Sequence, residues 1–234
     1  MFGMINKLIN GDKTGSNNKE AVQMKKVLFI TANPKAEAHS YSLEAGRKFI
    51  EAYKVQNPQD QVSELDLYNL EIPYIDAEVF SGWGKLGAGQ NFSELTESEK
   101  VKVGAINGYT DQFIDADKYV FVTPMWNLSL PPKVKVYIDT VMIANRTFKY
   151  TEHGPVGLLT DKKALHVHAS GGIYTEGPAQ GMEFGNSYLK SVLRFMGVED
   201  FNSVHLEGTN MTQTGGGEIK EKAHSELEKL VLEF

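Results

Sequence analysis

The chain has 234 residues, 41% of them hydrophobic, which suits one globular domain that buries about 70–75% of its unfolded surface. Its net charge of −6 argues against a general affinity for nucleic acid or anionic membranes, because both depend on basic patches. The absence of cysteine excludes disulfides, thiol nucleophiles and thiolate metal sites. With no signal-peptide pattern and no apolar run long enough for a membrane span, we expect a cytoplasmic protein.

The first residues differ in character from the rest of the chain. An apolar stripe at helical spacing within FGMINKLIN (2–10) is followed by a polar, turn-rich stretch at 11–20. A partner-binding or membrane-touching helix is one interpretation, but so short a stripe favours a frayed appendage. We therefore expect an N-terminal extension and linker over 1–24 and a single domain over 25–234.

Strands and helices alternate from Lys26 onward. The continuous apolar run VLFIT (27–31) is typical of a strand buried on both faces of a parallel sheet. A helical pattern at 43–55 and an alternating pattern at 61–67 complete a β-α-β unit whose second strand lies at an edge. The segment 68–95 is rich in glycine and aromatic residues and shows no clear period, which indicates a functional connection or a packing arm.

The later elements follow the same alternation. In TESE (96–99), Thr96 and Glu99 form a capping box that begins a helix. The patterns then predict strands at 118–124, 164–169 and 203–208, and helices at 96–116, 131–144, 186–197 and 218–234. This order predicts an α/β fold, namely a flavodoxin-like, doubly wound five-stranded parallel sheet with strand order 2-1-3-4-5. In such a sheet, ligand residues lie just past the carboxyl ends of the first, third and fourth strands.

The loop after the first strand places two serines where a helix begins. Ser40 and Ser42 can act simply as helix caps, or their hydroxyls can join free backbone N–H groups in binding a phosphate. The loop matches neither a nucleotide P-loop nor a dinucleotide G-x-G-x-x-G fingerprint. The residues alone leave both interpretations open.

The other two loops suggest a planar ligand. After the third strand comes PMWNLSLPP (124–132), in which Trp126 is either core filling or, with Asn127, one wall of a ring site. After the fourth strand comes SGGIY (170–174), whose glycines permit either a tight turn or a close approach of the backbone to a ligand. A phosphate-type loop, an aromatic wall and a glycine loop at these three positions together favour flavin mononucleotide, FMN.

The same motifs carry a family resemblance. With Ser40-Tyr41-Ser42, PMWN (124–127), NRTFKYTEHGPVGLL (145–159) and SGGIYTEGPAQGMEFG (170–185), the chain from about Lys26 onward resembles the FMN-dependent NADH:quinone oxidoreductases, or azoreductases, of bacteria. The resemblance implies hydride transfer from NADH or NADPH through bound FMN to quinones or aromatic azo compounds, by ping-pong exchange through one slot. It supplies no feature that discriminates the two nucleotides. No conventional catalytic side chain is implied, because backbone N–H groups can stabilise the reduced flavin.

The resemblance also implies site residues and a homodimer with the flavin at the subunit interface. Tyr150 and Phe195 would line the substrate slot, one from each subunit. Asn33 stands where the family often has serine, and Leu128 stands where it commonly has phenylalanine. The implied cofactor-binding residues are Asn33, Ser40, Tyr41, Ser42, Met125, Trp126, Asn127, Leu128, Ser170, Gly171, Gly172 and Ile173.

Four other interpretations compete with this one. A flavodoxin-type electron carrier would bind FMN without a substrate slot, but the long segments 68–95 and 145–163 argue against it. His166 and His168 share one face of a strand and suggest a metal hydrolase. Because no carboxylate cluster accompanies them, the better interpretation is that the two histidines pack under a helix. His153 beside Glu152 suggests an acid/base role, but a solvated loop pair is the better interpretation. A serine hydrolase is not supported, because the sequence contains no G-x-S-x-G nucleophile motif.

Overall fold

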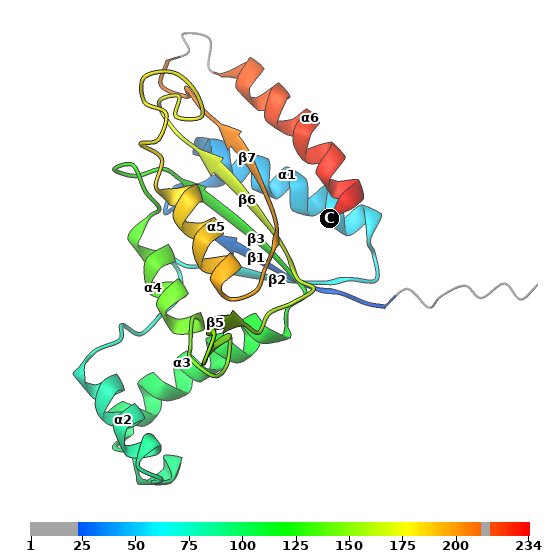
Figure 1. The fold of residues 1–234 in the computed structure, drawn as a ribbon. Helices are drawn as coiled ribbons and strands as arrows, with labels where there is room; N and C mark the ends of the chain where they lie inside the picture. Colours follow the sequence, from blue (N-terminus) through cyan, green and yellow to red (C-terminus); the bar gives the residue numbers. More distant parts are fainter. Residues whose placement is uncertain (1–22, 212–215) are drawn as a thin grey trace, which may run out of the picture.

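The computed structural model describes residues 23–211 and 216–234, so the expected extension over 1–24 lies almost wholly outside the described residues. A five-stranded sheet forms the centre of the molecule, with helices on both faces (Figure 1). Its order is β2-β1-β3-β6-β7, and every neighbouring pair is parallel. In order of strands within the sheet this is 2-1-3-4-5, so the predicted fold class is confirmed.

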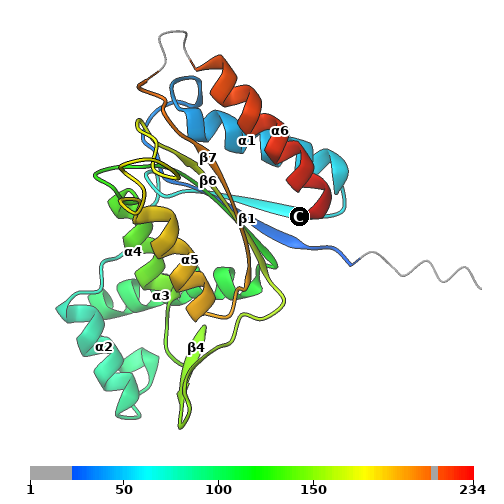
Figure 2. The same ribbon diagram turned by 45° about the horizontal axis from the view of Figure 1, so that its top comes forward.

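The central strands are β1 (Lys26–Thr31), β2 (Gln61–Asp66), β3 (Lys118–Pro124), β6 (Lys163–Ala169) and β7 (Asp200–Leu206). The main helices are α1 (Tyr41–Gln56), α2 (Ala77–Gly87), α3 (Glu97–Asp115), α4 (Pro132–Val141), α5 (Gly185–Phe195) and α6 (Gly217–Glu233). Helices α1 and α6 cover one face of the sheet, and α3, α4 and α5 cover the other (Figures 1 and 2). Each face has its own hydrophobic cluster, as expected for strands that bury side chains on both sides.

The segment 68–95 contains a helix that the sequence pattern did not reveal. Helix α2 carries three glycines in 11 residues, and glycine is a poor helix former, so its helical period is weak. Asp76 caps its first turn through bonds from the N–H groups of Glu78 and Val79, both 3.1 Å. Gly82 permits close packing on α3, because a Cβ there would lie 2.9 Å from Val103 Cγ2. The segment is therefore a packed arm rather than an irregular connection (Figure 1).

The segment 145–163 also has structure of its own. It contains an antiparallel hairpin of β4 (Phe148–Thr151) and β5 (Gly154–Gly157), which lies outside the main sheet. The hairpin is fixed just past its second strand, where the N–H of Leu159 donates to the Met196 carbonyl at 2.8 Å. A Cβ on Gly157 would lie 2.2 Å from the Gly197 nitrogen, so only glycine fits this contact.

Element boundaries differ from the predicted ones mainly in the second half of the chain. Helix α4 ends at Val141 rather than near 144, and β7 occupies Asp200–Leu206 rather than 203–208. The capping box of Thr96 and Glu99 at the start of α3 is confirmed.

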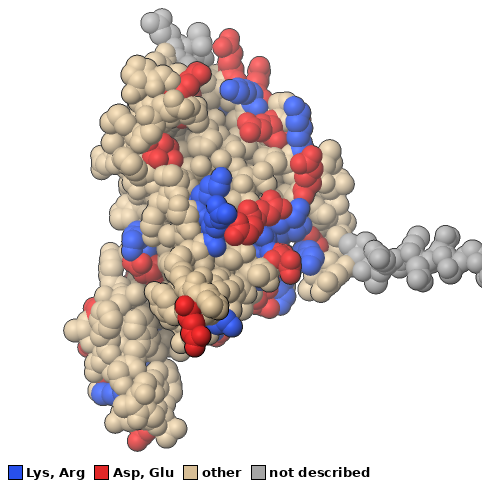
Figure 3. All heavy atoms as spheres, viewed as in Figure 1, with Lys and Arg blue, Asp and Glu red and all other residues tan. Residues whose placement is uncertain are grey.

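None of the helices in the described ranges is both long enough and apolar enough to cross a bilayer. Charged side chains of both signs lie interspersed over the face shown in Figure 3.

Candidate functional site: three loops at one edge of the sheet

The three loops singled out by the sequence meet at the carboxyl edge of the sheet. Strands β1, β3 and β6 are neighbours, so the segments that leave them begin side by side. Backbone hydrogen bonds continue past the strand ends: Ala32 N donates to the Val122 carbonyl at 3.0 Å, and Met125 N donates to the Ala169 carbonyl at 2.7 Å. The site is therefore built on rigid strand ends, where open α/β sheets bind ligands.

The first loop is organised around the Ser40 hydroxyl. Ser40 is the N-cap of α1, and its Oγ accepts a bond from the Leu43 N–H at 3.3 Å. Asn33 Nδ2 donates to the same oxygen at 2.9 Å, while Asn33 Oδ1 accepts from the N–H of Lys35 at 3.1 Å. Ser42 Oγ lies 3.3 Å from Ser40 Oγ. Ser40 therefore caps α1 and at the same time forms the hydroxyl pair with Ser42, so the helix-cap and phosphate-site interpretations are compatible.

This loop has the chemistry of an anion site. The first N–H groups of α1, a helix of 16 residues, carry the positive end of the helix dipole. Asn33, Ser40 and Ser42 are buried, so their polar atoms act in a water-poor setting. Tyr41 lies between the serines in sequence, and its ring stands 5.2 Å from Lys220 Nζ at the start of α6. The arrangement suits a terminal phosphate, as FMN would supply.

The second loop is a two-residue turn. Trp126 and Ser129 exchange backbone bonds of 2.8 and 3.0 Å, with Asn127 and Leu128 at the tip. Both tip residues have positive φ, 49° and 68°, as a type I′ turn requires. Trp126 is 36% exposed and packs edge-on against Tyr68 at 6.1 Å, so it is a surface wall rather than core filling. This result favours the ring-site interpretation.

The third loop is held by backbone groups at and just past the end of β7 and by the Ser170 hydroxyl. Ser170 N donates to the Leu206 carbonyl at 2.9 Å, and Ser170 Oγ donates to the Gly172 carbonyl at 2.9 Å. The Gly208 N–H donates to the same Gly172 carbonyl at 3.0 Å. Ser170 is buried, so it shapes the loop, while Ile173 is 39% exposed beyond it.

Asn210 is a site-edge residue that sequence reasoning missed. A Cβ on Gly171 would lie 2.4 Å from Asn210 Nδ2, so Gly171 is glycine at least partly to admit this side chain. The N–H of Asn210 donates to the Gly171 carbonyl at 3.1 Å. Asn210 follows β7, the fifth strand of the sheet, and the rule applied to the first, third and fourth strands would have found it if extended to the fifth.

A buried polar chain lies beneath the second and third loops. Thr123 Oγ1 is 2.9 Å from His166 Nε2 and 3.3 Å from His168 Nδ1, and His166 Nδ1 is 2.8 Å from Asn186 Oδ1 at the start of α5. Burial lowers the pKa of His166 to about 4 and that of His168 to about 2. His168 Nε2 lies 3.6 Å from Glu183 Oε1.

The histidines are accordingly neutral and packed under α5, as expected. Within the described residues, no group of three or more histidine, aspartate and glutamate side chains is arranged to hold a metal ion. His153 and Glu152 are both exposed in the β4–β5 turn. The acid/base role that their proximity suggested gains no support from this position.

Tyr150 and Phe195 lie together at the other end of the molecule. Both rings pack edge-on against Phe148, with centroid distances of 5.5 and 4.9 Å. Tyr150 is on β4 and is 72% exposed, and Phe195 ends α5. Figures 1 and 2 place the hairpin opposite the loops at the carboxyl edge. The two residues that the resemblance assigned to different subunits therefore share one surface of a single chain.

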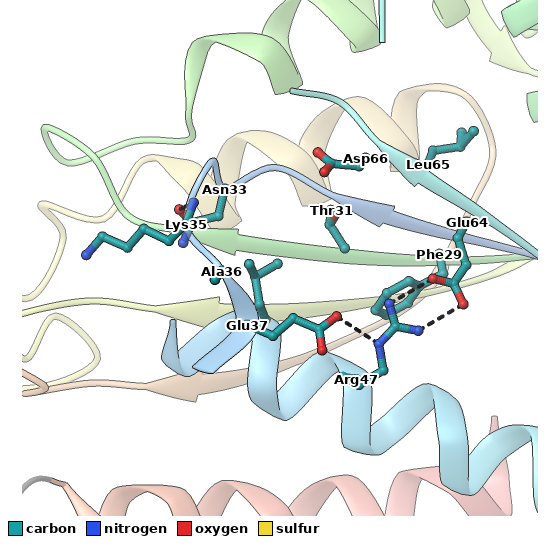
Figure 4. A pocket seen from close by; sticks show the side chains of 11 residues that line it. Phe29, Thr31, Asn33, Lys35, Ala36, Glu37, Arg47, Glu64, Leu65 and Asp66 are labelled. Carbon is teal, nitrogen blue, oxygen red and sulfur yellow. Dashed lines mark hydrogen bonds and ion pairs between the residues drawn. The ribbon is translucent and has the colours of Figure 1, made fainter. Parts of the chain in front are cut away.

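A cavity of about 230 Å³ borders the first loop on the side of β2 (Figure 4). Arg47 crosses it, donating through Nε to Glu37 at 2.9 Å and through its two terminal nitrogens to Glu64 at 2.9 and 2.8 Å. The Arg47 guanidinium lowers the pKa of Glu64 to about 2. This cavity lies beside the phosphate-type loop and away from the two loops suited to a ring, and the Arg47 guanidinium in it is already neutralised by carboxylates.

Comparisons with known proteins agree with this geometry. The family model described as "Flavodoxin-like fold" matches residues 25–231. The FMN-dependent NADH:quinone oxidoreductase 2 of Bacillus subtilis is 56% identical over 200 residues, which cover 86% of this chain and 95% of that protein. The FMN-dependent NADH:quinone oxidoreductase of Geobacillus kaustophilus is 54% identical over 211 residues, covering 90% and 100%.

Solved structures give the same result. The azoreductase from Bacillus anthracis str. Sterne superposes with a TM-score of 0.84 at 39% identity, over 90% of this chain and all of that one. An FMN-dependent NADH-azoreductase from Bacillus anthracis str. Ames Ancestor, solved in complex with FMN, gives a TM-score of 0.84 at 37% identity, over 90% and 99%. The chain therefore belongs to the family of FMN-dependent NADH:quinone oxidoreductases, built on the flavodoxin-like fold.

Proposed function

We propose that this protein is an FMN-dependent oxidoreductase that transfers hydride from NADH or NADPH to quinones and reductively cleaves aromatic azo compounds. The observation that carries the proposal is the meeting of an anion-binding helix start and two ring-sized loops at one sheet edge. The relatives named as FMN-dependent NADH:quinone oxidoreductases and the azoreductase solved with FMN support the same reading. A reductase is favoured over an electron carrier, since the relatives are named as reductases.

The residues at this edge fit FMN. Ser40, Tyr41 and Ser42 would hold the phosphate with the first N–H groups of α1, and Asn33 would orient the Ser40 hydroxyl. The ring would lie between Met125–Leu128 on one side and Ser170–Ile173 on the other. When bound, FMN supplies the hydride-accepting and hydride-donating ring. The chain supplies binding, orientation and a backbone-lined setting for the ring's charge.

A homodimer would complete the substrate slot. Helix α5 has 11 residues and spans about 16 Å, so Phe195 at its end cannot reach the ring loops near its beginning. Tyr150 lies at the same distant end. For Tyr150 and Phe195 to line a slot at the ring loops, a second copy would have to bring both of them there, rather than one from each subunit as the resemblance implies. We also infer a cytoplasmic location, since the chain has no cysteine and uses a cytoplasmic electron donor.

The test is the visible spectrum of the protein reconstituted with FMN, recorded anaerobically before and after NADH, and then after a quinone. We expect flavin absorbance that bleaches with NADH and returns with quinone. Failure to retain FMN would overturn the proposal. A bound flavin that neither NADH nor NADPH reduces would instead identify an electron carrier, and sedimentation of the same sample tests the dimer.

A further inference from the structure

One segment connects the two loops assigned to the flavin ring. Residues 174–184, called here the strap, leave directly from Ile173 in the third loop. At the other end, the N–H of Phe184 donates to the Leu128 carbonyl at the tip of the second loop, at 2.8 Å. A Cβ on Gly185, the next residue, would lie 3.2 Å from the Leu130 nitrogen, so the junction is closely packed. The strap therefore borders the ring site from one side to the other.

Two carboxylates hold the strap at its ends. Glu207, just past β7, accepts bonds from the N–H groups of Tyr174 and Thr175 at 2.9 and 3.1 Å, and from the Thr175 hydroxyl. Glu183 accepts from the N–H groups of Asn186 and Ser187 at 2.6 and 3.2 Å, which fixes the strap to the start of α5. Because charge-assisted bonds of this kind are the stronger ones, the strap has a defined position.

The strap carries exposed apolar side chains at this border. Phe184 is 55% exposed and Met182 is 45% exposed, next to Ile173 at 39% and Trp126 at 36%. The upper left of Figure 3, where Figure 1 draws this part of the chain in yellow, shows isolated acidic side chains and otherwise uncharged atoms. Large apolar side chains left exposed beside a ligand site indicate a contact surface.

We propose that the strap forms the acceptor-facing wall of the substrate slot and that Phe184 determines specificity for the size of the acceptor ring. The flat, apolar face of a two-ring quinone can pack against Phe184, whereas a one-ring quinone leaves part of that contact unmade. This inference rests on the proposed function, because it takes the ring to lie between the second and third loops.

The first test compares Phe184→Ala with the wild-type holoenzyme on 2-methyl-1,4-naphthoquinone and 1,4-benzoquinone. We expect KM for the naphthoquinone to rise about fivefold or more and KM for the benzoquinone to change by less than about twofold, with kcat nearly constant. Phe184→Leu should recover part of the loss. Phe80→Ala on the distant arm α2 is the matched control, since Phe80 is also exposed, at 64%.

The second test loosens the strap at its anchor. Glu207→Ala should speed chymotrypsin cleavage after Tyr174 or Phe184, located by mass spectrometry, and raise KM for the naphthoquinone. Glu176→Ala removes an exposed carboxylate on the strap itself and should do neither. Equal cleavage and equal KM in Glu207→Ala and the wild type would overturn the anchoring by Glu207 and with it the wall.

Failure of this inference differs from failure of the proposed function. If wild-type protein binds FMN and NADH reduces it, but Phe184→Ala leaves both KM values unchanged, the strap is not the wall. If Phe184→Ala instead weakens FMN binding to the apoprotein, Phe184 is a cofactor contact, and if it changes the molar mass in solution, it is a subunit contact. Either result overturns the specificity role.

Discussion

Asn33 Nδ2 donates to Ser40 Oγ at 2.9 Å, which ties the residue just past β1 to the cap of α1. The bond fixes the direction of the Ser40 hydroxyl in the loop that we assign to the FMN phosphate. Asn33→Asp replaces this donor with a charged acceptor of the same shape and places a negative charge beside the phosphate. We expect the dissociation constant for FMN to rise about tenfold or more, because like charges at this range repel strongly where water is scarce.

Fluorescence quenching of FMN on titration with apoprotein measures the effect. Asn33→Ser is the matched control: it shortens the side chain without adding charge and installs the residue that the family often has. It should weaken binding much less. Equal affinity of Asn33→Asp and wild type would show that the phosphate lies elsewhere.

Replacement of the serine pair tests the phosphate loop directly. Ser40→Ala combined with Ser42→Ala should weaken FMN binding while the fold is retained. Loss of the Ser40 cap should in addition lower the free energy of unfolding by about 1 kcal/mol, whereas Ser42→Ala alone removes no cap. Ser191→Ala, on the exposed side of α5, serves as control. Unchanged flavin affinity in the double variant contradicts the assignment.

The strand ends of this site were predictable because the strands themselves are. Runs such as VLFIT at 27–31 are apolar on both faces, which is typical of strands in a parallel sheet covered on both sides. Once the order 2-1-3-4-5 is fixed, the loops after β1, β3 and β6 must lie together. The start of α3 was also predictable, because the capping box of Thr96 and Glu99 forms between residues three apart in sequence and does not depend on the rest of the fold.

What sequence patterns missed depends on contacts between distant residues. Helix α2 is glycine-rich and is stabilised by α3, with Lys85 paired to Glu99 at 2.8 Å, a contact that no local period shows. The glycines of the third loop were interpreted as a tight turn or as a close approach to a ligand, whereas the group that lies against Gly171 is the side chain of Asn210, 39 residues further along. Tyr150 and Phe195 came from resemblance alone, and only the fold shows that both contact Phe148.

The turn tip at Asn127 and Leu128 offers a test of backbone strain. Leu128 has φ 68°, a conformation that costs about 1 kcal/mol in a residue with a Cβ and that glycine adopts freely. Leu128→Gly should therefore raise the free energy of unfolding by up to about 1 kcal/mol in urea titrations. Asn127→Gly should gain little, because asparagine already suits the first tip position. A loss of stability in Leu128→Gly would mean that packing by the leucine side chain outweighs the strain.

The buried histidines predict how stability depends on pH. Burial holds the pKa of His166 at about 4 and of His168 at about 2, below the value of about 6.5 expected when unfolded. Between about pH 6.5 and pH 4 the unfolded chain therefore binds more protons, so stability falls as pH falls through this window. From about pH 7.5 to pH 5 the loss should reach about 2 kcal/mol per histidine.

Urea titrations at the two pH values, on wild type, His166→Gln and His168→Gln, measure this loss. Each variant should be less stable at neutral pH yet lose less on acidification, while His153→Gln in the exposed turn should behave like wild type. Glu64 and Glu99, whose pKa values are lowered to about 2 by Arg47 and Lys85, contribute a loss only below about pH 4.5. If His166→Gln and His168→Gln show the same pH dependence as the wild type and the His153→Gln control, the histidines under α5 are not neutral in the folded protein.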